Sequence, residues 1–321
     1  MDRTLILHIG HSKTGSTTLQ KLVFPQLTRF YYSYKDHTPA STQIESAFMR
    51  SPEIWRRCGA SIFDQLRAEM RHNAGAASAL ISAESISAHK IFTMPEGTPN
   101  DHRRDPFLLA AHLKQFQAAA ERAGFDRLKV LMGIRRQDQY LASRYVTNGW
   151  LAARPPLQKD FERESLEIID PDKRYFIDGI WLDYKTTHDL IAGVVGEKNL
   201  LVLPVEQLGN EPSQYFSTLS GFLGEPLKGL NLERRNVRSI APDVWKIEKT
   251  ATRKAARKRR LGLVRALLAR GAEIRLSLEL KEKILSVYRD SNQSLAAVLN
   301  LDLSRYGYCA STPPEAPWAV C

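Results

Sequence analysis

A glycine-containing loop follows the first apolar run of the chain. The run Leu5–Ile9 leads into Gly10-His-Ser-Lys-Thr-Gly15-Ser-Thr-Thr18, and an apolar helix pattern follows. In a strand, loop and helix of this order, backbone N–H groups converge on one point and bind an anion. Gly10 and Gly15 have the spacing of G-x-x-x-x-G-K-[ST], but Ser16 stands in place of the lysine, which has moved to Lys13. A lysine this early in the loop suits one 5′-phosphate and its attached group better than a triphosphate.

The segment from His8 to Gln20 resembles the phosphosulfate-binding loop of sulfotransferases that use 3′-phosphoadenosine 5′-phosphosulfate (PAPS), most of all the bacterial and carbohydrate-type branch. The resemblance implies that Lys13 contacts the 5′-phosphosulfate and stabilises charge on the bridging oxygen. It also implies that the loop residues Thr14, Gly15, Ser16, Thr17 and Thr18 bind the 5′-phosphate. The alternative is an ordinary turn with a solvated lysine, which six consecutive matches from Lys13 to Thr18 disfavour.

This resemblance requires a second strand that ends in an arginine, with a serine eight residues on, to hold the 3′-phosphate. The buried-strand pattern Leu128–Ile134 is followed by Arg135, and Ser143 has the required spacing. Ligands collect at the carboxyl ends of strands in open α/β sheets, and an arginine offers a fork to phosphate. The Asn-Pro that is common in the family is here Arg136-Gln137. Either arginine could therefore point inward, although the spacing favours Arg135.

A further arginine, Arg235, belongs to the stretch Arg234–Ser239, which resembles a loop that closes over the 3′-phosphate in related enzymes. A charged surface turn explains this stretch equally well. The resemblance to these sulfotransferases implies PAPS as the donor and adenosine 3′,5′-bisphosphate as the product. It implies that no metal is required.

Sulfuryl transfer to a hydroxyl needs a base for the acceptor proton and positive charge near the leaving oxygen. Lys13 supplies the charge. Glu84 follows the apolar run Ala79–Ser82 and is the first choice for the base. In carbohydrate sulfotransferases a Glu or His near this point is the base, so His89 and His11 stay open as alternatives. A carboxylate that satisfies N–H groups at a helix start explains Glu84 equally well.

Short apolar runs alternate with longer helical patterns, as is typical of a parallel sheet covered by helices. We expect an α/β, three-layer, P-loop-like fold with about five parallel strands and appended C-terminal helices. The strands expected are Thr4–Ile9, Arg29–Tyr34, Ala79–Ser82, Leu128–Ile134 and Asn199–Leu203. The helices expected are Thr17–Leu27, Pro106–Ala123, Gln139–Asn148, Ile180–Val195, Pro212–Leu223 and Leu278–Leu301. The segments Met94–Asp105 and Leu151–Pro171 are rich in Pro, Gly and charge and indicate surface excursions that could serve as lids.

The chain of 321 residues carries a net charge of +11, most of which lies between Trp245 and Arg270. In that stretch Lys246, Lys249, Arg253, Arg257 and Arg260 follow helical spacing and form one stripe. The rest of the chain is nearly neutral, which argues against wrapping a nucleic acid. The stripe suits either a solvated helix face or contact with an anionic acceptor or acidic lipid head groups.

We interpret residues 1–321 as a single domain, with a cofactor-binding core over 1–240 and a C-terminal helical extension that carries the basic helix over 241–321. Three scattered cysteines and the lack of an apolar span predict a soluble, cytoplasmic protein without a disulfide framework or zinc site. The function expected is transfer of the PAPS sulfuryl group to a hydroxyl of a carbohydrate or glycolipid. The alternatives are a nucleotide-dependent kinase and a non-enzymatic module that binds an anionic polymer or membrane.

Overall fold

The computed structural model describes residues 2–34, 38–72, 76–86, 105–147, 156–173, 176–227, 239–241, 243–247 and 272–309. These residues divide into two compact units that are interleaved along the chain. The first unit contains 2–34, 38–72, 76–86, 105–134 and 185–227, and the second contains the remainder. We describe each unit by itself. The prediction of a single domain with a boundary near residue 240 stays a prediction.

A parallel sheet of five strands forms the centre of the first unit, in the order β2-β3-β1-β4-β5. The strands are β1 (Thr4–His8), β2 (Phe30–Tyr34), β3 (Ser78–Ser82), β4 (Arg127–Ile134) and β5 (Leu200–Pro204). In the central strand β1, Leu5, Ile6 and Leu7 have no exposed surface. Such continuous apolar runs are typical of strands that are covered on both faces.

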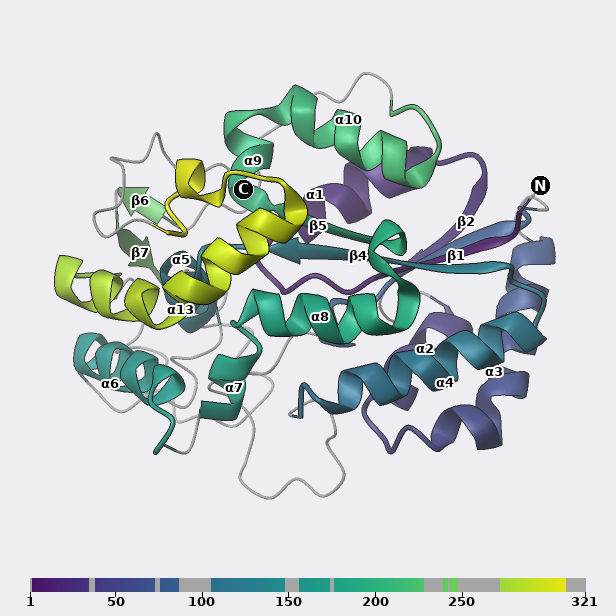
Figure 1. The fold of residues 1–321 in the computed structure, drawn as a ribbon, viewed down its shortest axis with the longest axis horizontal. Helices are drawn as coiled ribbons and strands as arrows, with labels where there is room; N and C mark the ends of the chain where they lie inside the picture. The colour runs from purple at the N-terminus through teal and green to yellow at the C-terminus, as the bar shows by residue number, and fades with distance from the viewer. Residues whose placement is uncertain are drawn as a thin grey trace. The chain divides into compact units, whose positions relative to one another are not determined.

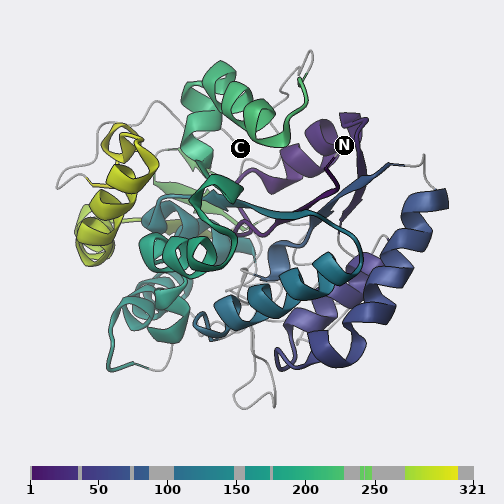
Figure 2. The same ribbon diagram turned by 45° about the vertical axis from the view of Figure 1, so that its right-hand side comes forward.

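The helices of the first unit lie on both faces of this sheet (Figures 1 and 2). On one side are α1 (Ser16–Thr18), α9 (Val205–Asn210) and α10 (Pro212–Leu223). On the other side are α2 (Pro39–Phe48), α3 (Ile54–His72), α4 (Leu108–Arg122) and α8 (Tyr184–Val195). Shorter turns of π or 3₁₀ helix occupy Leu19–Val23, Phe24–Gln26, Glu84–Ile86 and Glu197–Asn199.

The strand order explains these layers. The connection from β1 to β2 runs toward one edge of the sheet, whereas those from β2 to β3, β3 to β4 and β4 to β5 run toward the other. Because crossovers between parallel strands are right-handed, a reversal of direction moves the connecting helix to the opposite face. The reversal also places a switch point between the neighbouring strands β1 and β4, where open α/β sheets bind ligands.

The second unit contains the helices α5 (Gln137–Thr147), α6 (Leu157–Ile169), α7 (Phe176–Ile180) and α13 (Leu278–Leu299) and a 3₁₀ turn at Leu303–Tyr306. It also has an antiparallel sheet of β6 (Ser239–Ala241), β7 (Val244–Lys246) and β8 (Glu273–Arg275). Tyr288 of α13 donates a hydrogen bond of 3.0 Å to the carbonyl of Gly179, which ties α13 to the end of α7.

The α/β fold class and the five parallel strands are confirmed. Several other predictions are wrong. Leu151–Pro171 was expected to be a surface excursion, yet Leu157–Ile169 forms α6 because Phe161, Ser165 and Ile168 bury one helical face. Thr17–Leu27 is divided among α, π and 3₁₀ turns, and Ile180–Val195 is interrupted between α7 and α8. Of the two lid-like segments, residues 94–104 and 151–155 lie outside the described residues.

The start of the expected basic helix is also wrong, because Trp245 and Lys246 belong to strand β7. Trp245 pairs with Ile274 of β8 and is 1% exposed, so burial of its ring favours the strand. The rest of the basic stripe, Lys249–Arg260, lies outside the described residues. No helix within the described ranges has both the length and the apolar character that a membrane crossing requires.

Candidate functional site

The loop after β1 lies against β4 in the first unit. The N–H of Ile9 donates to the carbonyl of Leu131 at 2.9 Å, and the N–H of His11 donates to that of Gly133 at 3.3 Å. The chain therefore stays beside β4 beyond the end of β1. It then turns through Lys13 and Gly15, which have φ values of 76° and 78°. Positive φ is costly for a lysine, so the surrounding structure must hold the backbone of the loop in this conformation.

The first helical turn begins directly behind the loop. The carbonyl of Gly15 accepts hydrogen bonds from the N–H groups of Thr18 at 2.9 Å and Leu19 at 3.2 Å. The first N–H groups of a helix have no acceptor within the helix. Those of Ser16 and Thr17 therefore point out of its start, where the helix end is electropositive. This geometry suits an anion such as the 5′-phosphate.

Two glycines allow the loop to approach β4 closely. A Cβ atom on Gly10 would lie 2.7 Å from the backbone nitrogen of Gly133, and one on Gly133 would lie 2.7 Å from Oγ1 of Thr14. Thr14 is 2% exposed and donates its hydroxyl to the carbonyl of His11 at 2.5 Å. The hydroxyl of Thr14 therefore fixes the shape of the loop from inside. Gly133 was not among the sequence-predicted site residues, although a glycine within an apolar strand is a signal of close backbone approach.

The predicted phosphate-binding residues differ in how far they reach solvent. Thr14, Ser16 and Thr18 are buried, whereas Lys13, Gly15 and Thr17 are half-buried. Lys13 and Thr17 are thus accessible to a ligand at the switch point between β1 and β4. The alternative base His11 is 1% exposed within this loop.

A chain of buried polar side chains connects the carboxyl ends of β1 and β3. Nδ1 of His8 lies 2.7 Å from the hydroxyl of Ser82. The amide nitrogen of Gln20 donates to Oγ of Ser82 and to Oε1 of Glu84, both at 2.9 Å. Glu84 itself is half-buried at the start of a 3₁₀ turn. The structure therefore anchors the predicted base through Gln20.

The deeper members of this chain are buried and uncharged. His8, Ser82 and Gln20 are all at most 2% exposed, and burial lowers the pKa of His8 to about 3. His8 is consequently neutral at physiological pH, so it can orient Ser82 but cannot act as an acid. Gln20 ends the segment that resembles the phosphosulfate-binding loop, but the sequence assigned it no role. A polar residue at a buried position of an apolar helix pattern is a second signal.

Tyr32 of β2 also contacts this chain of polar side chains, through Gln20. Its hydroxyl donates to the carbonyl of Gln20 at 2.9 Å, and its ring stacks on that of Tyr34 at a centroid separation of 5.5 Å. Burial raises the pKa of Tyr32, with smaller contributions from Tyr34 and the charge of Glu84. Tyr32 is therefore a neutral donor beside the carboxylate of Glu84.

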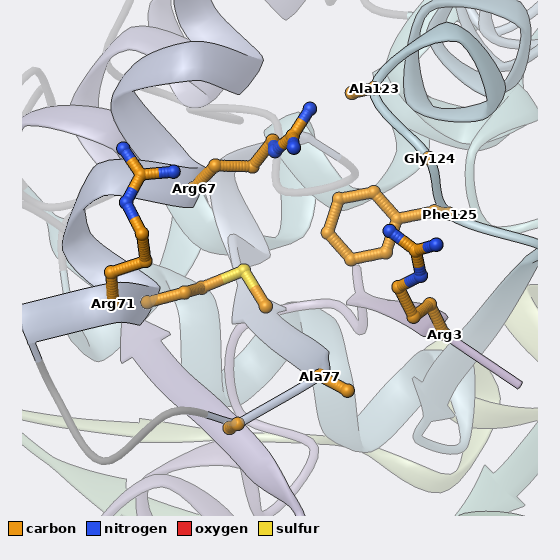
Figure 3. Close-up of a pocket in the computed structure, with 9 residues that line it drawn as sticks. Arg3, Arg67, Arg71, Ala77, Ala123, Gly124 and Phe125 are labelled. Carbon is orange, nitrogen blue, oxygen red and sulfur yellow. The ribbon is translucent and has the colours of Figure 1, made fainter. Parts of the chain in front are cut away.

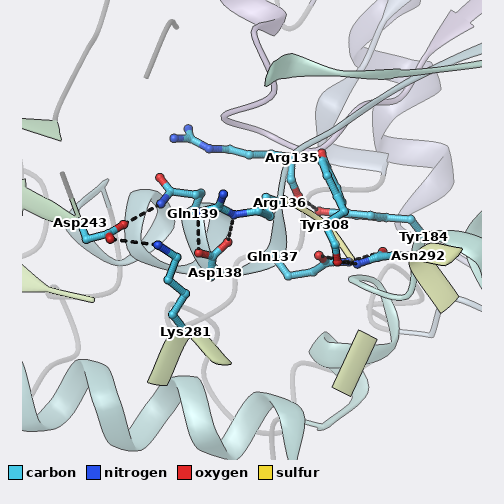
Figure 4. A network of polar contacts seen from close by, with 10 residues as sticks. All are labelled: Arg135, Arg136, Gln137, Asp138, Gln139, Tyr184, Asp243, Lys281, Asn292 and Tyr308. Carbon is cyan, nitrogen blue, oxygen red and sulfur yellow. Dashed lines mark hydrogen bonds and ion pairs between the residues drawn. The ribbon is translucent and has the colours of Figure 1, made fainter. Parts of the chain in front are cut away.

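In the second unit, the residues after β4 form a polar network (Figure 4). Arg136 binds Asp138 through both oxygens, with Nε to Oδ1 at 2.7 Å and Nη2 to Oδ2 at 2.9 Å. Both side chains are buried. The guanidinium fork of Arg136 is thus engaged within the protein, which favours Arg135 as the phosphate ligand. Figure 4 shows the Arg135 side chain extending separately from the Arg136–Asp138 pair.

The backbone of Arg135 and the start of α5 are held by side chains of the same unit. The hydroxyl of Tyr184 donates to the carbonyl of Arg135 at 2.6 Å, and the amide of Gln137 donates to Oδ1 of Asn292 at 2.9 Å. Ser143 lies in the second turn of α5 and is 5% exposed. The Arg135 and Ser143 assignments remain predictions.

Lys13 and Glu84 belong to the first unit and Arg135 and Ser143 to the second. Their joint site is therefore also a prediction. His89 and Arg235 lie outside the described residues. Within the described ranges, no group of three or more His, Cys, Asp or Glu side chains has the arrangement of a metal site.

Comparisons with known proteins give a likeness of fold. No protein-family model and no curated protein sequence matches the chain. Among solved structures, a sulfotransferase from Alicyclobacillus acidocaldarius is similar over 96% of this chain and 100% of its own, with 11% identity and a TM-score of 0.52. The sulfotransferase domain of the Synechococcus PCC 7002 olefin synthase covers 71% of this chain and 75% of its own, with 12% identity and a TM-score of 0.37. The chain therefore shares the fold of the first of these proteins.

Proposed function

We propose that the chain is a sulfotransferase that moves the sulfuryl group of PAPS to a hydroxyl group of an acceptor. The observation that carries this proposal is the loop from Gly10 to Thr18, packed against Gly133 at the switch point between β1 and β4. The loop presents backbone N–H groups and Lys13 to an anion. Its displaced lysine suits a 5′-phosphosulfate, and the fold likeness to a bacterial sulfotransferase supports the same function.

In this proposal each residue has a separate role. Loop N–H groups and Thr17 bind the 5′-phosphate, and Arg135 and Ser143 bind the 3′-phosphate. Glu84 accepts the acceptor proton as the acceptor oxygen forms its bond to sulfur. The bond between sulfur and the bridging oxygen breaks at the same time. The ammonium group of Lys13 stabilises the negative charge that develops on that oxygen.

The acceptor class is proposed from the aromatic side chains beside Glu84. Tyr32 and Tyr34 lie half-buried near Glu84, and aromatic rings of this kind suit a sugar ring. We propose a carbohydrate or glycolipid acceptor. The basic stripe, now restricted to Lys249–Arg260, is proposed to attract an anionic acceptor or lipid head groups.

A thermal-shift titration tests the donor. Adenosine 3′,5′-bisphosphate, without metal, is expected to raise the unfolding temperature by several degrees at saturation, because a ligand that binds only the folded state stabilises it. Adenosine 5′-monophosphate and Mg-ATP at the same concentration serve as controls. Greater stabilisation by Mg-ATP would contradict the proposal and favour a kinase.

A further inference from the structure

A pocket lies in the first unit at the amino ends of the parallel strands, whereas the glycine loop lies at their carboxyl ends (Figure 3). Its volume is about 240 Å³. Arg3 precedes β1, Ala77 precedes β3 and Phe125 precedes β4, and all three line the pocket. Because these strands are parallel, their amino ends lie together at one end of the sheet. The pocket is therefore distinct from the proposed PAPS site, which lies at the carboxyl ends.

The pocket combines an apolar floor with a rim of arginines. Met70 and Phe125 line it and are 6% and 5% exposed. Arg67 and Arg71 are four residues apart on α3, so their side chains share one face of that helix. The third arginine, Arg3, comes from the strand side, and Figure 3 shows its guanidinium group beside the ring of Phe125.

The absence of a side chain at Gly124 leaves space for the side chain of Arg3. The Nη1 atom of Arg3 lies 3.0 Å from the position that a Cβ atom on Gly124 would occupy. The φ of 89° at Gly124 also favours glycine there. The turn before β4 thus places the guanidinium group of Arg3 against the pocket.

The three guanidinium groups have no acidic partner among the residues that the structure describes. Ion pairs there involve other arginines, such as Arg56 with Glu53 and Arg127 with Asp2. Asp126 accepts a hydrogen bond of 2.7 Å from the backbone N–H of Arg3. All three side chains are exposed, so a bound anion can reach each guanidinium group.

A structural reason accounts for only part of this cluster. Arg71 lies in the last turn of α3, where a cation stabilises the helix end. Arg67 lies a turn further back and Arg3 is on a different element, so neither has this explanation. Both line a pocket whose floor is buried and apolar, which suits a ligand with one charged and one apolar part.

We propose that this pocket binds a small organic anion, in which a phosphate, sulfate or carboxylate group is attached to a compact aromatic or alkyl group. The anionic group would contact the guanidinium groups of Arg3, Arg67 and Arg71, which offer paired N–H donors. The apolar group would cover Met70 and Phe125. At about 240 Å³ the pocket is smaller than the sites of drug-sized ligands, which limits the occupant to a single ring or short chain.

Calorimetric titration with phenyl phosphate tests the proposal. We expect one site with a Kd of about 1 mM or tighter, as an efficient ligand of this size allows. Inorganic phosphate, which lacks the ring, and phenol, which lacks the charge, should each bind at least about tenfold more weakly. Equal affinity for phosphate and phenyl phosphate would overturn the role of the apolar floor.

Variants locate the binding. Arg67→Gln and Arg71→Gln should each weaken phenyl phosphate binding about tenfold, because each removes charge-assisted hydrogen bonds. Ala77→Phe fills the pocket from an exposed position and should abolish binding without altering charge. Arg57→Gln, an exposed arginine elsewhere on α3, is the matched control and should bind as the wild type does. Binding that survives all three pocket variants, or that falls equally in Arg57→Gln, would overturn the proposal.

Discussion

At the scale of single residues, the two neighbouring arginines after β4 have different tasks. Arg136 is buried against Asp138, whereas Arg135 is half-buried with its backbone held by Tyr184. The sequence spacing favoured Arg135 but could not show that Arg136 has an internal partner. That partner, Asp138, lies two residues further on, and only the geometry of the helix start brings both of its oxygens onto Arg136.

Arg135→Ala is expected to weaken binding of adenosine 3′,5′-bisphosphate about tenfold or more, because it removes the guanidinium N–H donors proposed to bind the 3′-phosphate. Binding of adenosine 5′-phosphosulfate, which lacks that phosphate, should be unchanged. Arg136→Ala should instead destabilise the fold by about 3–5 kcal/mol, since it leaves Asp138 buried without its partner. Calorimetry and thermal unfolding measure the two effects. Unchanged affinity in Arg135→Ala would remove this residue from the site.

Gln20 positions the predicted base. Gln20→Met keeps the length of the side chain but removes the hydrogen bonds to Ser82 and Glu84. We expect kcat to fall about tenfold while the affinity for adenosine 3′,5′-bisphosphate stays within about twofold, because the amide positions the predicted base Glu84. Glu84→Gln should lower kcat by about 10²–10⁴-fold.

The double variant separates positioning from a general structural role. If Gln20 acts through Glu84, adding Gln20→Met to Glu84→Gln should cost no further activity. Additive losses would show that Gln20 has a different task. Full activity in Glu84→Gln would transfer the role of base to His89 or His11.

At the scale of elements, the loop and β4 are coupled through Gly133. Gly133→Ala would place a Cβ atom 2.7 Å from Oγ1 of Thr14. We expect this overpacking to cost about 1–3 kcal/mol of stability and to weaken nucleotide binding by displacing the loop. Gly221→Ala in α10 is the control, because nothing lies within 4 Å of its added Cβ. Thermal unfolding and calorimetry would detect both effects. A fully stable Gly133→Ala protein with normal nucleotide binding would contradict the coupling.

Helix α6 carries a buried carboxyl group, Glu164, whose Oε2 has no hydrogen-bond partner within the described part of the chain. Burial, together with the nearby charge of Asp160, raises the pKa of Glu164 to about 8. The folded protein therefore holds a proton that the unfolded chain releases above about pH 4.5. The stability that this proton supplies is complete below that pH and is lost as the pH rises through about 8.

Glu164→Gln should therefore gain stability relative to the wild type as the pH rises. We expect the difference in unfolding temperature to grow by about 5 °C or more between about pH 5 and pH 9. Glu162→Gln, a half-buried position on the same helix, separates burial from loss of charge. A difference that does not depend on pH would show that Glu164 is ionised in the folded protein.

The elements that sequence patterns identified best are the strands of the parallel sheet, in which most residues are buried. Strands β1 to β5 are runs of apolar residues, and each lies within about one residue of its predicted bounds. Helices α2 and α3 were not among the predicted elements. The signals were present: Thr38 caps α2 before Pro39, and Trp55, Ile62, Phe63 and Leu66 are buried along α3.

At the scale of the whole molecule, the antiparallel sheet of the second unit could not be predicted from the sequence. Its antiparallel sheet consists of strands of three residues, and β7 pairs with β8 nearly thirty residues further along the chain. Strands this short have no periodicity to detect, and their pairing depends on long-range contacts. The loop motif was identifiable because its chemistry is local, whereas Gln20, Ser82 and Gly133 became site residues only through folding.

The most direct test of the proposed function is a transfer experiment. The protein would be incubated with PAPS and a panel of glycans, glycolipids and phenols, with mass spectrometry of the acceptors and quantification of adenosine 3′,5′-bisphosphate. We predict an acceptor that gains one sulfuryl group in equal amount with the bisphosphate released. Lys13→Ala should bind the bisphosphate with modest loss but transfer at least about 10²-fold more slowly, because its charge is needed chiefly when the bridging oxygen leaves. Release of bisphosphate at an equal rate in the wild type and Lys13→Ala, with no sulfated product, would contradict the account.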